Sequence, residues 1–171
     1  GLLLSHRADW AIVSEVEQND DVLFKPLFSY EMVGICSKDH PLANKEVWQA
    51  EDFAEETWVT YPVPDDMLDL YRQVLKPKGI NPPRRTTELT IALIQLVASR
   101  RGIATVPYWA ALPYLEKGYV VARKITEEGL YSNLYAAIRK EDANLAYIED
   151  FHQTVKAQSF STLPGLSVLE L

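Results

Sequence analysis

Residues 90–107 read TIALIQLVASRRGIATVP, and this stretch predicts a helix that turns directly into a strand. The segment Ile91–Arg101 is apolar on almost every side, which is typical of a helix buried between a sheet and another element. Thr90 is placed to cap the amino end of this helix, and Gly102 to turn the chain into a strand over Ile103–Val106. A buried helix followed by a short apolar strand indicates an α/β fold.

Short apolar runs alternate with helical patterns along the rest of the chain, as expected for a largely parallel sheet. Apolar residues at three- and four-residue spacing predict one helix after Pro64, which Pro77 and Gly79 end, and another over Ala143–Gln158. The other strands that we expect are Trp10–Val13, Leu27–Ser37, Thr57–Tyr61, Arg84–Glu88, Tyr119–Arg123 and Ser132–Arg139.

The opening of the chain looks like the end of a helix, Leu2–Ser5, that leads straight into a strand. An α/β lobe of this kind begins with a strand and a crossover, and both would lie before residue 1. The sequence contains no internal repeat or low-complexity stretch that would make this opening a linker. We therefore expect a fragment whose first lobe is truncated at its N-terminal side.

The composition is that of a globular protein with an acidic surface. With 171 residues, 47% of them hydrophobic, the chain can bury the core of one domain or of two small lobes. The net charge of −7 and the absence of a basic stripe make the chain itself a poor nucleic-acid binder. No run of residues suits a membrane span or a secretory leader, so we expect a cytoplasmic protein. The single cysteine, Cys36, is expected in a buried strand.

Residue patterns that would indicate an enzyme are missing from the sequence. The three histidines, His6, His40 and His152, are far apart, and none has a neighbour at metal-ligand spacing. The sequence also lacks a nucleophile elbow, a P-loop and a dinucleotide-binding glycine pattern. We therefore expect no enzymatic activity, no metal site and no cofactor.

Candidate binding residues follow from the rule that ligands of open α/β sheets bind beyond the carboxyl ends of the strands. Helix amino termini there direct backbone N–H groups into a crevice, where these groups can bind an anionic part of a ligand. The candidates are Ser14, Glu15, Tyr61, Pro62, Val63, Thr87, Glu88, Thr90, Pro107 and Tyr108.

Several of these candidates have an equally simple structural role. Thr90 can serve only as a helix cap, and Glu88 can pair with Arg84 or Arg85 on the surface. Tyr61 can be a core aromatic residue rather than a binding platform.

Three segments resemble the effector domain of LysR-type transcription regulators, in the same order and at the same distances. These segments are Arg7–Ser14, Lys38–Ala43 and Leu96–Pro107. Within this family, three further segments are similar to activators of methionine biosynthesis. They are Val59–Val63, Ala92–Val97 and Leu134–Arg139.

The resemblance implies two α/β lobes of the type II periplasmic-binding-protein kind, joined by two crossing strands around a cleft. Lobe one would comprise residues 1–40 and 135–171, and lobe two residues 41–134. The crossings would lie near Lys38–Leu42 and Leu134–Arg139. The helix-turn-helix domain would lie outside this chain and would make all contact with DNA.

The resemblance also implies a function: effector sensing and oligomerisation in a regulator of methionine biosynthesis, with homocysteine as the co-effector. The sensing domains would pair in a homodimer or tetramer, and Leu2–Arg7 and Leu23–Tyr30 are the candidate pairing segments. A solute-binding receptor of a transporter shares the fold class and remains the alternative, although a receptor requires an export signal.

Overall fold

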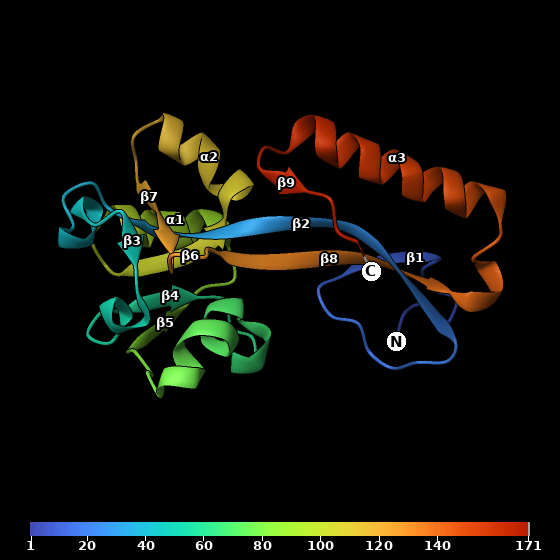
Figure 1. Cartoon of the computed structure of the whole chain (residues 1–171), viewed down its shortest axis with the longest axis horizontal. Coiled ribbons are helices and arrows are strands. Elements are labelled where there is room, and N and C mark those ends of the chain that lie inside the picture. The colour runs from blue at the N-terminus through green and yellow to red at the C-terminus, as the bar shows by residue number, and fades with distance from the viewer. Residues whose placement is uncertain (171) are drawn as a thin grey trace. The chain divides into compact units, whose positions relative to one another are not determined.

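The computed structural model describes residues 1–170, which form two compact units. Unit 1 contains residues 1–30 and the residues from Ser132 onward, and unit 2 contains residues 31–131. The chain passes between the units twice, within strand β2 (Val22–Cys36) and within strand β8 (Leu130–Arg139) (Figure 1). The first crossing therefore precedes the expected boundary at residue 40, because β2 continues unbroken through it and changes its pairing partners inside the strand.

Unit 1 is built on β2, β8 and two shorter strands. Strand β1 (Trp10–Val13) pairs antiparallel with β8, which lies beside β2. The two-residue strand β9 (Leu166–Ser167) pairs antiparallel with β2. Helix α3 (Ala146–Thr162) lies alongside these strands (Figure 1). It packs against them through aromatic residues. The strand predicted at Trp10–Val13 is confirmed with the same boundaries.

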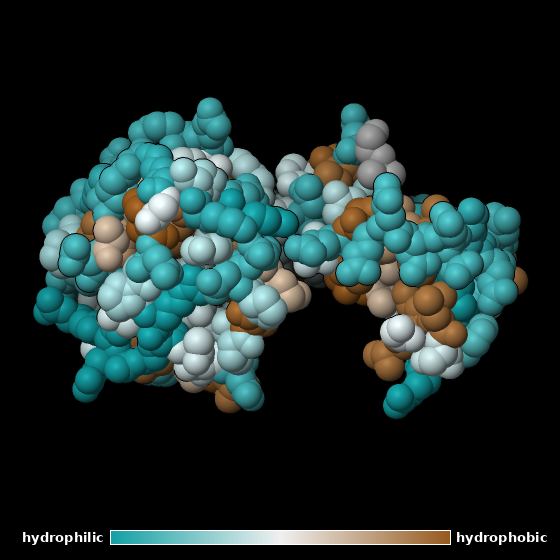
Figure 2. Space-filling model, turned by 90° about the horizontal axis from the view of Figure 1, so that it is seen from below, coloured by the Kyte–Doolittle hydropathy of each residue, from teal (hydrophilic) through white to brown (hydrophobic). Residues whose placement is uncertain are grey.

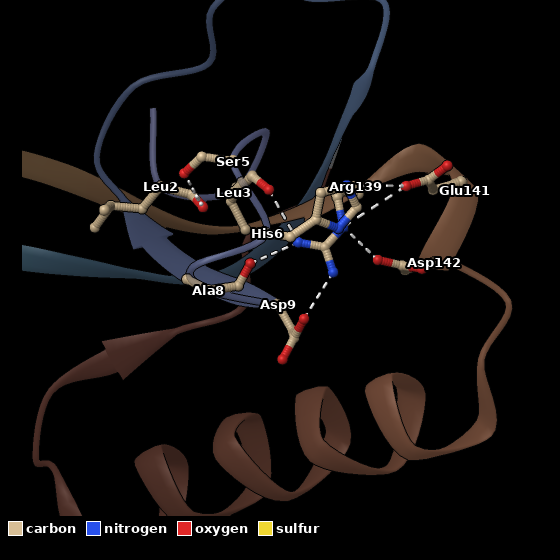
Figure 3. A network of polar contacts seen from close by, with 9 residues as sticks. All are labelled: Leu2, Leu3, Ser5, His6, Ala8, Asp9, Arg139, Glu141 and Asp142. Carbon is tan, nitrogen blue, oxygen red and sulfur yellow. Dashed lines mark hydrogen bonds and ion pairs between the residues drawn. The ribbon is translucent and has the colours of Figure 1, made fainter.

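Arg139, the last residue of β8, holds the N-terminal segment in place (Figure 3). Its guanidinium donates to the carbonyl oxygens of Leu3 and Ala8 at 2.9 and 2.6 Å. It also donates to the carboxylates of Asp9 and Asp142. Only 7% of the Arg139 side chain is exposed, and a buried charge is tolerated when it is paired and hydrogen-bonded in this way.

Unit 2 contains the parallel part of the fold. Strand β4 (Trp58–Thr60) runs parallel to β5 (Arg84–Thr86) and to β6 (Ile103–Pro107). The second half of β2 pairs antiparallel with β6 and with β7 (Val121–Ile125), and β7 pairs parallel with β3 (Val47–Trp48). The sheet is therefore mixed rather than largely parallel, because the two crossing strands run against their neighbours. The α/β fold class is confirmed.

Two apolar cores lie on opposite faces of the unit 2 strands, as the alternation of strand side chains requires. Ile35 belongs to the core that helices α1 (Thr90–Ala98) and α2 (Tyr108–Glu116) cover. Its neighbour Cys36 belongs to the core built around Trp48. The cysteine is fully buried, as predicted, and burial raises the pKa of its thiol to about 11.

The helices differ from the sequence predictions in three respects. Thr90 is the first helical residue of α1 and Leu89 occupies the cap position, so Thr90 is not the N-cap. Helix α1 is buried on one face only, because Ile91 and Gln95 are exposed. The predicted helix after Pro64 is a series of short turns. The short helical segments of the chain are Pro41–Asn44, Ala50–Phe53, Asp65–Met67, Tyr71–Leu75, Lys76–Lys78 and Lys140–Asp142.

Apolar side chains reach the surface of each unit among hydrophilic ones (Figure 2). In unit 1 these include Leu2, Leu4 and Leu23. Leu27, Phe28 and Tyr30 are buried inside the unit, so Ser29 is the one partly exposed residue in the second half of the expected pairing segment Leu23–Tyr30. Within residues 1–170, no helix is both long and apolar enough to cross a membrane.

Gly34 in β2 lies against the indole ring of Trp48. A Cβ atom at position 34 would come within 2.4 Å of a Trp48 ring carbon, and Trp48 is fully buried. We expect Gly34→Ala to lower the free energy of unfolding by about 1–3 kcal/mol, measured by urea denaturation. The loss caused by Gly34→Ala should be smaller in a Trp48→Phe variant, because the smaller ring leaves space for the Cβ atom. An equal loss in the wild type and in the Trp48→Phe variant would contradict this explanation.

His152 on α3 is a buried titratable group of unit 1 that lies in a largely apolar setting. Only 4% of the residue is exposed, its ring centroid lies 6.4 Å from that of Trp10, and its Nδ1 has no hydrogen-bond partner among the described residues. Burial lowers the pKa of His152, Lys25 and Lys156 lower it further, and Glu149 opposes them.

The lowered pKa of His152 makes the stability of the chain depend on pH. Below about pH 6.5 the unfolded chain binds the proton more readily than the folded chain, so the free energy of unfolding should fall as the pH drops. Urea denaturation between about pH 8 and 5 should show a smaller loss for His152→Gln than for the wild type. The matched control is His6→Gln, since the His6 side chain is 67% exposed, and a loss reduced equally in both variants would contradict the assignment to the buried histidine.

Candidate functional site

The carboxyl ends of three parallel strands meet at one edge of unit 2. Thr60 at the end of β4 lies opposite Thr86 at the end of β5, and Val59 lies opposite Ala104 of β6. The residues that follow these strands therefore share this edge, as the ligand rule for open sheets requires. Eight of the ten predicted site residues belong to it: Tyr61, Pro62, Val63, Thr87, Glu88, Thr90, Pro107 and Tyr108.

Tyr61 and Thr90 form the centre of this edge. The hydroxyl oxygens of Tyr61 and Thr90 lie 2.7 Å apart and share a hydrogen bond. The backbone N–H of Thr87 donates to the carbonyl oxygen of Thr60 at 3.0 Å, which fixes the loop between β5 and α1 to the end of β4. Tyr61 and Tyr108 also pack on the apolar core beneath α1 and α2, so the aromatic side chains serve both the core and the edge.

The amino termini of two helices lie at the same edge. Helix α1 begins at Thr90 and helix α2 at Tyr108, directly after β6. The first N–H groups of an α-helix have no partner within the helix and carry a partial positive charge, which suits an anionic oxygen. No side chain caps either helix, so these N–H groups are not taken up by a cap.

Glu88 does not pair with Arg84, since Arg84 forms an ion pair with Asp65. The Arg84 guanidinium also lies over the rings of Trp58 and Tyr71, 5.1 and 5.0 Å from their centroids. These contacts hold Arg84 at the start of β5, whereas Glu88 is exposed beyond the end of that strand.

Ser14 and Glu15 follow β1 and belong to unit 1. They therefore do not share the edge that the other eight candidates form within unit 2, and their role in a binding site stays a prediction.

Leu89 and Ile91 are neighbours of Thr90 that the strand-end rule did not predict as site residues. Both side chains are exposed, Leu89 at 63% and Ile91 at 56%, although both are large and apolar. They add exposed apolar surface at the start of α1. The signal available in the sequence was their position directly beside a predicted helix start, but the apolar run made them look like core residues.

Other side-chain clusters in the described part of the chain carry no comparable site. A cavity of about 260 Å³ in unit 1 is lined by Leu4, Asp20 and Arg139 among others, but the Arg139 guanidinium already binds two carbonyls and two carboxylates. Among residues 1–170, no three His, Cys, Asp or Glu side chains are grouped so that they could hold a metal ion.

Residues 1–159 match the family model for the LysR substrate binding domain. The chain belongs to the LysR family. Proteins of this family are transcription regulators and not enzymes, and this chain corresponds to their effector-binding domain. The resemblance found in the sequence is thereby confirmed.

The relatives of this LysR domain are regulators named MetR. The HTH-type transcriptional regulator MetR of Haemophilus influenzae is 85% identical over 171 residues, which is all of this chain and 55% of that protein. MetR of Escherichia coli K12 is 35% identical over 162 residues, 95% of this chain and 51% of that protein. The chain thus spans about half the length of the curated relatives it matches.

Solved structures agree with the LysR fold. The regulatory domain of MetR from N. meningitidis has a TM-score of 0.92 and 65% identity, and it covers 99% of this chain and 78% of its own. The effector-binding domain of QuiR in complex with shikimate has a TM-score of 0.75 over 92% of this chain and 76% of its own; at 24% identity it supports the fold alone. The predicted fold, a type II periplasmic-binding-protein-like effector domain, is confirmed.

The hydrogen bond between Tyr61 and Thr90 can be tested without a ligand. Tyr61→Phe removes it and should lower the free energy of unfolding by about 0.5–1.5 kcal/mol in urea denaturation. Tyr131→Phe, which removes the hydroxyl of a half-exposed tyrosine, is the control and should change stability less. If Tyr61→Phe and Thr90→Val act additively in a double-mutant cycle, the two hydroxyls do not interact.

Proposed function

We propose that this chain is the effector-sensing and oligomerisation domain of a bacterial transcription regulator that controls methionine biosynthesis in the cytoplasm, with homocysteine as co-effector. The observation that carries the proposal is the 85% identity to MetR over the whole chain. The relatives are helix-turn-helix regulators, which favours this function over a transporter receptor of the same fold class.

The chemistry of the unit 2 edge suits one end of a small amino acid. A carboxylate would accept hydrogen bonds from the Thr90 hydroxyl and from the first N–H groups of α1. The Glu88 carboxylate is exposed beside Thr90 and would pair with the ammonium group. Val63 and Ile91 offer apolar surface for the side chain of the ligand.

Tyr61 has a defined part in this proposal. When its hydroxyl donates to Thr90 Oγ1, the Thr90 proton is directed elsewhere and is available for a ligand oxygen. Tyr61 therefore acts on the effector through Thr90.

Binding of homocysteine is the direct test. Isothermal titration of L-homocysteine into the regulator that contains this domain should show saturable binding, and Thr90→Val should weaken it about 10-fold, the loss of one hydrogen bond to a charged group. Tyr131→Phe is the matched control and should bind as the wild type does. Saturable binding of methionine but not of homocysteine would contradict the assignment of the co-effector.

Contact with DNA would come from a helix-turn-helix domain of the regulator and not from this acidic chain. A symmetric dimer or tetramer would present such domains to repeated half-sites. Exposed apolar residues of unit 1, among them Leu2, Leu4 and Leu23, are the surface that we assign to pairing of the sensing domains.

A further inference from the structure

The two crossing strands are the places where the chain passes from one compact unit to the other. The passages lie at Tyr30–Glu31 in β2 and at Tyr131–Ser132 in β8. Any change in the relative placement of the units must therefore be absorbed by backbone dihedral angles at these two points. A contact that fixes the backbone at these two points therefore limits any such conformational change.

The C-terminal segment returns to the first of these points. Helix α3 ends at Thr162, and Gly165, with φ of 75°, lets the chain turn back. Strand β9 then pairs antiparallel with β2, with Leu166 opposite Tyr30 and Ser167 opposite Ser29. The segment thus forms its strand on the last two residues of β2 that belong to unit 1.

An aromatic contact links the same segment to the same place. The ring of Phe160 in the last turn of α3 meets the ring of Phe28 edge to face, with centroids 6.3 Å apart. Phe28 in turn meets Tyr30, with centroids 6.2 Å apart. Phe28 and Tyr30 are both buried, so these rings have fixed positions and can hold the backbone of β2.

A side-chain hydrogen bond connects β2 to β8 next to the two crossing points. The Ser29 hydroxyl donates to the carbonyl oxygen of Ser132 at 3.3 Å. Ser132 is the first residue of β8 on the unit 1 side. Restraint of Ser29 by β9 is therefore passed to β8, although β9 itself pairs with β2 and not with β8.

We propose that residues 160–167, here named the C-terminal brace, form a regulatory element that restrains the hinge between the two units. The brace holds Phe28–Tyr30 through a strand pair and through aromatic packing, and it acts on Ser132 through Ser29. Its loss frees both crossing strands at the points where they leave unit 1.

Hydrogen exchange of backbone amides measures how firmly the crossing strands are held. The experiment requires no effector, so its result does not depend on the homocysteine assignment. A stop after Leu163 removes β9, and a stop after Ser167 keeps β9 and is the matched control. The diagnostic amides are those of Ser132 and Asn133 in β8, because they do not pair with β9. Exchange at these amides should become at least about 10-fold faster in the shorter chain only.

Two further outcomes decide between a brace and a simple terminal strand. Phe160→Leu, which removes the ring contact but leaves β9, should give a smaller acceleration at the same β8 amides. Amides of Val59 and Ala104 in unit 2 should keep their rates, which shows that the fold is intact. Faster exchange confined to Ser29 and Tyr30, or equal acceleration throughout both units, would overturn the proposal.

Discussion

A single 15-residue strand, β2, supplies backbone hydrogen bonds to both compact units. Its first half pairs within unit 1, and its second half lies between β6 and β7 in unit 2. Ile35 and Cys36 are fully buried and face opposite cores, so neither face of the strand is free at this point. The absence of a side chain at Gly34 allows Trp48 to approach the backbone, and the core around Trp48 depends on that contact.

The sequence correctly predicted those elements whose hydrophobic pattern and whose length both indicate the same kind of secondary structure. Trp10–Val13 and Ile103–Val106 are short apolar runs with clear ends, and both form strands at these positions. Helix α2 was not predicted because Pro113 lies inside it, and proline normally argues against a helix interior. Strand β2 begins before the predicted Leu27 because extended backbone tolerates Pro26, which the pattern treats as a break.

The sequence predicted which strand ends form the candidate site, but it did not predict which side chains contact one another there. Parallel pairing collects the carboxyl ends of β4, β5 and β6 at one edge, and this follows from fold class alone. The bond between Tyr61 and Thr90 joins residues 29 positions apart, and no local pattern indicates it. Thr90 was expected to cap α1, but its hydroxyl binds Tyr61 while Leu89 takes the cap position. A tertiary contact has replaced a local one.

The tryptophans are divided unevenly between the two units, and this gives the chain two separable optical signals. Trp48, Trp58 and Trp109 lie in unit 2, and Trp10 is the one tryptophan of unit 1. A chain with phenylalanine at position 10 would emit tryptophan fluorescence from unit 2 alone, and the difference from the wild type would report on unit 1. Whether the two halves of this protein melt together or in sequence can therefore be observed in one fluorimeter, with no added label.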